Sequence, residues 1–399
     1  MRKSDRILAA AAIISVAIYS VACRLAWDSS GERVAFPFEA TLATESGDKT
    51  ISGVAVYYTA TGEVKRLYEE EGDDFSQGGH VVWTEEGDRI IATAPKGDKA
   101  LRVIEINATS GKAETIAILP GVGVSVLGPI LIDKTLYVGL PRSGDNKWSL
   151  GAVDIDSWEV KEEFGSTDSS LSVYGVGESG LVYVRAALGK AKFAVGTIDD
   201  GDMEDVFTLP EGDYPDPGPW LAVEGNGTRL ATVLRVDEKP TVRVLDEDGT
   251  VVKDIGISGT QVDNCACMTW IGDTIWIGAV RKNREEKKKQ LGIVKVTVES
   301  GDAIFIPLGD AFPLNEHADE EYWIQPSLSP DGRTVAVSGF FLSSEKVEGP
   351  IALVLLDAAA PEKEPRYIPL PLKEGEAVWR GDLTASTDSV LAPEGEESE

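Results

Sequence analysis

Residues 326–337 read Pro-Ser-Leu-Ser-Pro-Asp-Gly-Arg-Thr-Val-Ala-Val, and this stretch indicates the fold. Apolar and polar positions alternate on both sides of the Pro-Asp-Gly sequence, as they do in strands that are buried on one face. Gly332 supplies the positive φ that a tight hairpin turn requires. The stretch therefore predicts a β-hairpin that turns at Asp331 and Gly332.

The same phrase occurs elsewhere in the chain. Residues 26–36 read Ala-Trp-Asp-Ser-Ser-Gly-Glu-Arg-Val-Ala-Phe, and residues 82–92 read Val-Trp-Thr-Glu-Glu-Gly-Asp-Arg-Ile-Ile-Ala. Looser copies contain Trp220 and Trp270, and Trp379 stands at a comparable point near the end of the chain. One large apolar residue per repeat predicts packing between repeats, with an aromatic ligand platform as the alternative.

A second hairpin follows each copy of the first. Its turn residues fall at positions 62, 111, 158, 201, 249, 301 and 361, so successive copies are 49, 47, 43, 48, 52 and 60 residues apart. Each period holds two hairpins, hence four strands, and such units at a period of about 40–50 residues are typical of β-propellers. We predict an all-β fold, a seven-bladed β-propeller of four-stranded antiparallel blades over residues 24–393. The blade limits are roughly 24–71, 78–120, 125–166, 171–211, 218–257, 266–309 and 324–372.

The end of the chain contains one further candidate strand pair, in residues 376–393. It either begins an incomplete eighth blade or closes the ring. Residues 394–399 are acidic and are predicted to be a disordered tail.

The motif at residues 328–336, with similar copies around Trp27 and Trp83, resembles the TolB-like (WD-like) propeller repeat of exported bacterial proteins. The resemblance extends from about residue 24 to residue 372. It implies that each copy of the phrase forms the first two strands of a blade. It also implies that the protein acts through protein–protein contact.

The first 23 residues predict an export signal or membrane anchor. A basic start with Arg2, Lys3 and Arg6 precedes an uncharged segment at residues 7–23, which we expect to be a hydrophobic helix. Three outcomes remain open: lipidation of Cys23 as in a bacterial lipoprotein, retention as an uncleaved anchor, or cleavage by signal peptidase. Each one places the remainder outside the cytoplasm, in the cell envelope or periplasm, with this segment as its membrane contact.

The composition excludes several classes of function. The chain has 399 residues with 38 Lys and Arg against 67 Asp and Glu, a net charge of −29, so we expect no nucleic-acid partner. Two His and three Cys exclude a multi-histidine metal centre and a four-thiolate zinc site. We predict no catalytic residue, no metal centre and no cofactor, with Ca²⁺ as the one candidate ligand ion, and a monomer.

Three shorter motifs have structural interpretations. Residues 175–180 match a dinucleotide fingerprint, Gly-x-Gly-x-x-Gly, but an apolar strand follows where that motif needs a helix, so we predict a hairpin turn. Cys265 and Cys267 are predicted to be a buried, inert pair, and whether they are bonded stays open. The mixed-charge run 281–289 is predicted to be a solvated hairpin tip, with partner docking as the alternative.

The candidate binding site lies in three acidic connectors, which precede blades two, five and seven. In a propeller such connectors lie on one face, around the mouth of the central channel. That face would bind a cationic ligand such as Ca²⁺, a basic peptide or an amine. The alternative is that these loops only keep an acidic protein soluble. The candidate residues are Asp73, Asp74, His80, Asp213, Asp216, Glu316, His317, Asp319 and Glu320.

Together these features predict an exported, envelope-anchored propeller that is a non-catalytic binding or scaffolding module for an unknown protein or peptide. One alternative is a propeller-based extracytoplasmic hydrolase or lyase that uses carboxylates and His at the channel mouth. The scarcity of His and the lack of a Gly-x-Ser-x-Gly nucleophile motif speak against it. The other alternative is a structural spacer.

Overall fold

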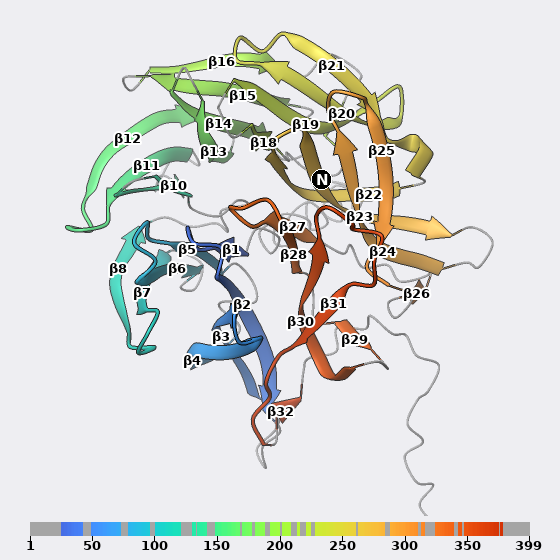
Figure 1. Ribbon diagram of the computed structural model, residues 1–399. Helices are drawn as coiled ribbons and strands as arrows, with labels where there is room; N and C mark the ends of the chain where they lie inside the picture. The colour runs from blue at the N-terminus through green and yellow to red at the C-terminus, as the bar shows by residue number, and fades with distance from the viewer. Residues whose placement is uncertain are drawn as a thin grey trace, which may run out of the picture.

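The protein is an all-β ring of antiparallel sheets (Figure 1). Strands near the centre of the ring come first in each sheet, and later strands lie progressively farther out. The structure is a computed structural model. It describes residues 25–42, 49–72, 79–95, 100–120, 130–132, 134–141, 148–167, 170–177, 180–187, 192–199, 202–208, 214–215, 221–224, 228–260, 262–283, 288–309, 313–315, 324–338, 342–344, 347–374 and 376–377.

The described strands form seven sheets, taken here in chain order. The first contains β1 (Ala26–Trp27), β2 (Arg33–Leu42), β3 (Lys49–Tyr58) and β4 (Glu63–Glu71), joined by β32 (Glu376–Ala377). The second contains β5 (His80–Trp83), β6 (Arg89–Pro95), β7 (Ala100–Asn107) and β8 (Ala113–Pro120). The third contains β9 (Ile130–Ile132), β10 (Thr135–Pro141), β11 (Trp148–Asp154) and β12 (Val160–Thr167). The fourth contains β13 (Ser170–Gly177), β14 (Gly180–Ala187), β15 (Lys192–Asp199) and β16 (Asp202–Thr208).

The last three sheets have short extra strands. The fifth contains β17 (Tyr214–Pro215), β18 (Leu221–Val223), β19 (Arg229–Val236), β20 (Lys239–Asp246) and β21 (Val251–Gly256), and the short 3₁₀ helix η1 (Ser258–Thr260) follows it. The sixth contains β22 (Val262–Ile271), β23 (Thr274–Asn283), β24 (Lys288–Thr297), β25 (Asp302–Pro307) and β26 (Pro313–Asn315). The seventh contains β27 (Gln325–Leu328), β28 (Thr334–Ser338), β29 (Leu342–Ser344), β30 (Val347–Asp357) and β31 (Arg366–Pro369).

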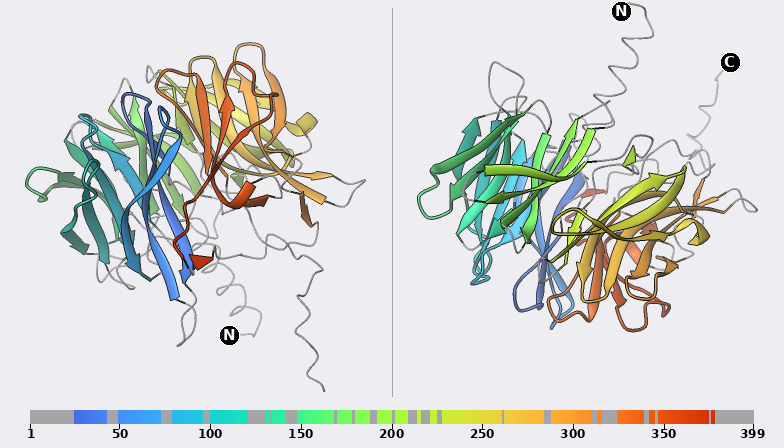
Figure 2. Two further views of the ribbon diagram at one scale, coloured as in Figure 1. Left: turned by 60° about the horizontal axis from the view of Figure 1, so that its bottom comes forward. Right: turned by 90° about the horizontal axis from the view of Figure 1, so that it is seen from above.

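Neighbouring sheets lie face to face around the ring (Figure 2). Between the first and second sheets, and between the fifth and sixth, Val, Ile, Leu and aromatic side chains from both sheets form the core. The last sheet packs on the first in the same way, through Phe36, Phe38 and Tyr57 against Leu353 and Ile368. The ring is therefore closed by a hydrophobic core. Large apolar side chains on both faces of a sheet are what such packing requires, and this requirement accounts for the Val- and Ile-rich strands.

The glycine turns that the sequence predicts are present. Gly31, Gly87 and Gly332 adopt φ of 72°, 67° and 70° in the first hairpins of their sheets. The second hairpins turn in the same way at Gly62, Gly111, Gly249 and Gly301. In the third sheet Trp158 takes this position with φ of 59°, although residues other than glycine are disfavoured there.

Trp27, Trp83 and Trp270 pack between adjacent sheets, as predicted, and Trp220 and Trp379 lie outside the described residues. The indole Nε1 of Trp83 donates to Ala26 O in the first sheet at 3.0 Å, and Trp27 Nε1 donates to Ser327 O in the seventh sheet at 3.0 Å. The fingerprint at residues 175–180 is a hairpin, also as predicted, because Gly177 pairs with Gly180 between β13 and β14.

Of the strand pair predicted in residues 376–393, the structure describes β32, whose Ala377 pairs with Thr41 of β2 (Figure 1), and residues 378–393 lie outside the described residues. Of the two alternatives for this segment, the strand therefore joins the first sheet. The N-terminal segment 1–23 and the tail 394–399 lie outside the described residues. Within the described part of the chain, no helix is long and apolar enough to cross a membrane.

Candidate functional site

The three predicted connectors are attached at one end of the sheets. The strands of each sheet alternate in direction. The outermost strand of a sheet therefore stops at the same end of the ring at which the innermost strand of the next sheet begins. We call this the connector end; in the first two sheets it is where β4 ends at Glu71 and β5 begins at His80. The opposite end, which carries the turn at residues 28–32, is the hairpin end.

Short strands flank the other two acidic connectors. Tyr214 and Pro215 form β17, which pairs with Arg235 and Leu234 of β19. Pro313–Asn315 form β26, which pairs with residues 288–290 of β24. The candidate residues themselves lie outside the described residues, as does the lipidation candidate Cys23. They are Asp73, Asp74, Asp213, Asp216, Glu316, His317, Asp319 and Glu320.

His80 is the one candidate residue that the structure describes. It is the first residue of β5, where it pairs with Thr93, and only 3% of its surface is exposed. The sequence interpretation placed His80 in a connector loop. A residue with this burial contributes to the core of the second sheet, and its imidazole is shielded from bulk solvent.

A half-buried polar cluster between the first two sheets was not predicted. Arg102 of β7 reaches across to Glu70 of β4, where its Nη1 donates to Oε2 at 2.7 Å and its Nη2 donates to Oε1. Tyr68 donates its hydroxyl to the same carboxylate at 2.6 Å. In the sequence Glu70 belongs to the acidic run 69–74 that leads into the connector before blade two, whereas β4 continues to Glu71 and holds this carboxylate on a sheet face.

Burial and the neighbouring Glu70 carboxylate together raise the pKa of Tyr68 to about 12. A tyrosine in the unfolded chain ionises near its usual pKa of 10. Between these two values the unfolded state loses the phenol proton while the folded state retains it, so stability falls as the pH rises from about 10 to about 12.

We therefore expect Tyr68→Phe to reduce this alkaline loss of stability. The measurement is urea unfolding of both proteins at pH 9 and pH 11. A Tyr68→Phe protein that loses as much stability as the wild type over this interval would contradict the assignment.

Other carboxylates at the connector end are also paired with basic side chains. Lys49 Nζ lies 3.0 Å from Glu71 Oε2, and Lys373 pairs with Glu69. Among the described residues, no group of three or more His, Cys, Asp and Glu is placed to hold a metal ion. Cys267 is a buried thiol, and the side chain of Cys265 is outside the described part.

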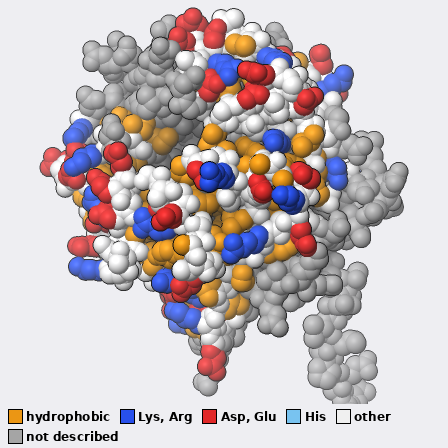
Figure 3. Space-filling model, in the orientation of Figure 1, with side chains coloured by type: hydrophobic (Ala, Val, Ile, Leu, Met, Phe, Trp, Pro, Cys, Tyr) orange, Lys and Arg blue, Asp and Glu red, His pale blue; other side chains and the backbone are white. Residues whose placement is uncertain are grey.

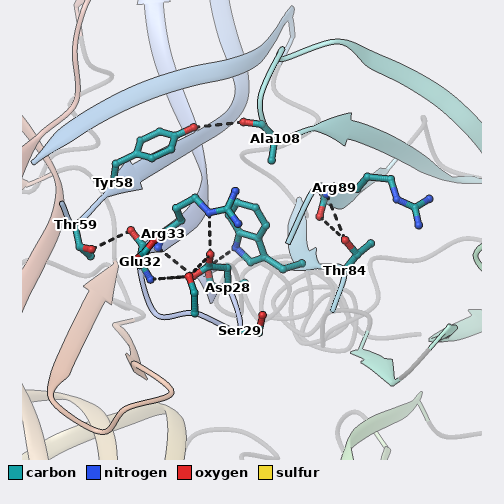
Figure 4. A network of polar contacts seen from close by, with 12 residues as sticks. Asp28, Ser29, Glu32, Arg33, Tyr58, Thr59, Thr84, Arg89 and Ala108 are labelled. Carbon is teal, nitrogen blue, oxygen red and sulfur yellow. Dashed lines mark hydrogen bonds and ion pairs between the residues drawn. The ribbon is translucent and has the colours of Figure 1, made fainter. Parts of the chain in front are cut away.

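The hairpin end contains a second polar network, centred on Asp28 (Figure 4). Asp28 is 1% exposed, and its carboxylate accepts hydrogen bonds from the backbone N–H of Glu32 and Arg33 at 3.0 and 3.1 Å. Arg33 Nε donates to Asp28 Oδ2 at 2.8 Å, which places the guanidinium 4.6 Å from the centre of the Trp83 ring in the next sheet.

The same arrangement recurs between the fifth and sixth sheets. Glu224 binds Arg229, five residues later, and the guanidinium lies 5.2 Å from the centre of the Trp270 ring. Arg229 holds the pKa of the Glu224 carboxyl below its usual value. These acid–Arg–Trp contacts stabilise the joint between adjacent sheets through charge and cation–π interactions. They are a structural feature of the repeat.

The described surface carries both signs of charge. On the face of the ring seen in Figure 3, acidic and basic side chains are interspersed with hydrophobic ones.

Comparison with solved structures supports a β-propeller. The β-propeller domain of the Trilobed protease from Pyrococcus furiosus, described as having an open velcro topology, aligns with a TM-score of 0.54 at 12% identity, over 88% of this chain and 96% of that chain. A putative 6-phosphogluconolactonase from Bacteroides uniformis aligns with a TM-score of 0.51 at 12% identity, over 86% and 98%. Acylaminoacyl peptidase from Pyrococcus horikoshii aligns with a TM-score of 0.52 at 11% identity, over 88% of this chain and 52% of that one.

At 11–12% sequence identity, these alignments show that the fold is shared and nothing more. This chain spans about half the length of the acylaminoacyl peptidase that it matches. No protein-family profile matches the sequence, and no curated protein matches it. The predicted β-propeller is confirmed.

Proposed function

We propose that this protein is an exported, envelope-anchored, seven-bladed β-propeller of the TolB-like type that binds a cationic protein or peptide at its connector end. The observation that carries the proposal is the position of the described strands that flank the three acidic connectors. The strands that flank them, β5, β17 and β26, all lie at one end of the sheets. Seven sheets in a closed ring support the blade count.

Charge chemistry supports a cationic ligand. The carboxylates at the described connector end, Glu69, Glu70 and Glu71, are already paired with Lys or Arg. The chain nevertheless keeps a net charge of −29, so unpaired acidic groups outnumber basic ones by a wide margin. Carboxylates on loops around a channel mouth attract a basic partner and bind Ca²⁺ through oxygen ligands.

The burial of His80 favours binding over catalysis. A general acid or base must reach the substrate, and a side chain with 3% exposure does not do so without movement of the connector that precedes it. This leaves His317 as the one histidine for an enzymatic role in the chain.

The connector variant Asp213→Asn, Asp216→Asn, Asp319→Asn, Glu320→Gln tests the ligand class. We expect a polylysine peptide or Ca²⁺ to raise the melting temperature of the wild type and to have a much smaller effect on the variant, because a ligand stabilises only the state that binds it. A matched control neutralises exposed acids at the hairpin end, Glu86→Gln and Asp331→Asn, and should respond like the wild type. A wild-type melting temperature unchanged by both ligands would refute the cationic ligand.

The partner and the anchor are tested together. Mild crosslinking of the membrane fraction, affinity purification and mass spectrometry should recover a specific partner and report whether Cys23 carries lipid. Recovery of the protein from the soluble cytoplasmic fraction would contradict export.

A further inference from the structure

The joint between the seventh and first sheets differs from the other joints in the ring. Each other pair of successive sheets is connected by the continuous chain, whereas the first sheet begins at one end of the chain and the seventh lies near the other. The connection here is a strap, which we define as residues 370–377. It leaves β31 of the seventh sheet and ends as β32 on the first sheet, with Gly375 outside the described residues.

The strap completes the inner strand of the first sheet. β1 pairs with Val34 and Ala35 near the start of β2, and β32 pairs with Thr41 and Leu42 at its end. Both segments run antiparallel to β2 on the same edge. The fifth sheet has a similar two-part inner strand, β17 and β18 on β19, but there one uninterrupted connector supplies both parts. In the first sheet the two parts come from opposite ends of the chain.

One buried ion pair fixes the end of the strap. The side chains of Arg66 in β4 and Glu376 in β32 are 5% and 4% exposed. Arg66 Nη2 donates to Glu376 Oε1 at 3.0 Å, and Nη1 donates to Oε2. The guanidinium also lies 4.4 Å from the centre of the Phe38 ring, and its Nε is 2.8 Å from Glu69 Oε1.

The strap adds three contacts around this pair. The backbone N–H of Lys373 donates to Glu376 Oε2 at 2.9 Å, and the Lys373 side chain pairs with Glu69. Arg66 Nη1 also lies 3.4 Å from Pro371 O. The charged groups that face Glu376 are thus Arg66, Lys373 and, through both of them, Glu69.

We propose that the strap is a charge-controlled latch, in which ionised Glu376 on Arg66 holds the ring closed and its loss lets the first and seventh sheets separate. Release of Glu376 leaves the Arg66 guanidinium buried without its main partner, and this is strongly unfavourable. The rest of the joint includes the hydrophobic core and the Arg366 guanidinium, which lies 5.8 Å from the centre of the Tyr57 ring. It also includes the Lys373–Glu69 ion pair and two hydrogen bonds, Trp27 Nε1 to Ser327 O and Leu25 N to Gln325 Oε1.

Acid should release the latch. Burial alone would raise the pKa of Glu376, but the hydrogen bonds from Arg66 and from the Lys373 backbone outweigh it, and the pKa lies below its usual value of 4.5. A lowered folded-state pKa gives stabilisation that is complete above pH 4.5 and is lost as the pH falls through the folded-state value. The joint should therefore open under acid conditions and stay closed at neutral pH.

Hydrogen–deuterium exchange on the full chain at pH 7 tests the latch. In Glu376→Gln we expect exchange in β1, β2 and β31 to rise on the order of 100-fold, with β23 and β24 in the sixth sheet unchanged, because only one joint opens. A matched control is Asp254→Asn, which removes the partner of the buried Arg243 within the fifth sheet and should leave the β1–β31 joint protected.

A second variant separates the latch from a general loss of stability. Arg66→Met with Glu376→Leu replaces the ion pair by apolar side chains, and we expect a joint that is protected at pH 7 and insensitive to acid. Unchanged exchange at the joint in Glu376→Gln would overturn the proposal. So would an equal rise in all sheets, or an acid response that persists in the double variant.

Discussion

Replacement of Gly278 by alanine is expected to lower the free energy of unfolding by about 3 kcal/mol or more. Gly278 lies in β23, and a Cβ atom there would stand 1.7 Å from the carbonyl oxygen of Ile324 and 2.6 Å from its carbonyl carbon. Both are backbone atoms, so no side-chain rotation relieves the overlap. The sixth and seventh sheets would have to move apart and disturb the hydrophobic core between them.

Urea unfolding of Gly278→Ala gives the magnitude, and Gly256→Ala is the matched control. Gly256 ends β21 in the fifth sheet, and a Cβ atom there would meet nothing within 4 Å. Since the chemical change is the same, we expect Gly256→Ala to stay within about 0.5 kcal/mol of the wild type. Equal stability of the two variants would mean that the two sheets do not approach as closely as described.

Asp28→Ala is expected to destabilise the protein by about 3 kcal/mol. The substitution removes a buried carboxylate that accepts hydrogen bonds from Ser30, the Glu32 backbone and both the backbone and side chain of Arg33. It also frees the guanidinium that stacks on Trp83, so the joint between the first and second sheets loosens.

The contributions of the turn and of the ion pair can be separated. In the second and seventh sheets the place of Asp28 is taken by Thr84 and Ser329, whose hydroxyls accept the backbone N–H of Arg89 and Thr334. Asp28→Thr should therefore retain the turn and lose only the contact with Arg33, with an effect about half that of Asp28→Ala. Thermal unfolding of the two variants measures this difference.

An exposed aspartate provides the control. Asp331 lies in the matching turn of the seventh sheet, and Asp331→Ala should change stability by less than about 1 kcal/mol. A value for Asp28→Ala as small as this one would contradict the role assigned to the buried carboxylate.

The repeat was predictable because its signals are local. Gly31, Gly87 and Gly332 each combine a required positive φ with alternating strands on both sides, so the sequence records the hairpin directly. The short strands β17, β26 and β29 lack such a signal, because their pairing is set by the neighbouring long strands. Trp158 shows the opposite case, a turn whose position follows from the period although its residue does not favour the conformation.

Side-chain contacts between sheets were harder to predict from the sequence. The acid–Arg–Trp contacts have a signal in hindsight, since an acidic residue precedes Arg by five positions at both Asp28 and Glu224. Arg66 and Arg102 have no such signal in the sequence, because their partners are brought to them by the packing of sheets in the ring and not by a fixed spacing in the chain. For the same reason Glu70, which reads as part of an acidic loop, is a paired residue on a sheet face.

The split inner strand places the first and the last described strands, β1 and β32, on one edge of β2. Ala26 and Ala377 lie on the same edge of β2, opposite Ala35 and Thr41, so only the five β2 positions 36–40 separate them along that edge. At about 3.4 Å per residue the gap is roughly 20 Å, which a short linker spans. A circular permutant that omits residues 1–25 and 378–399, joins Ala377 to Ala26 through such a linker and opens another connector would supply both parts of this inner strand from one continuous segment, as in the fifth sheet. Its ring would close through covalent bonds.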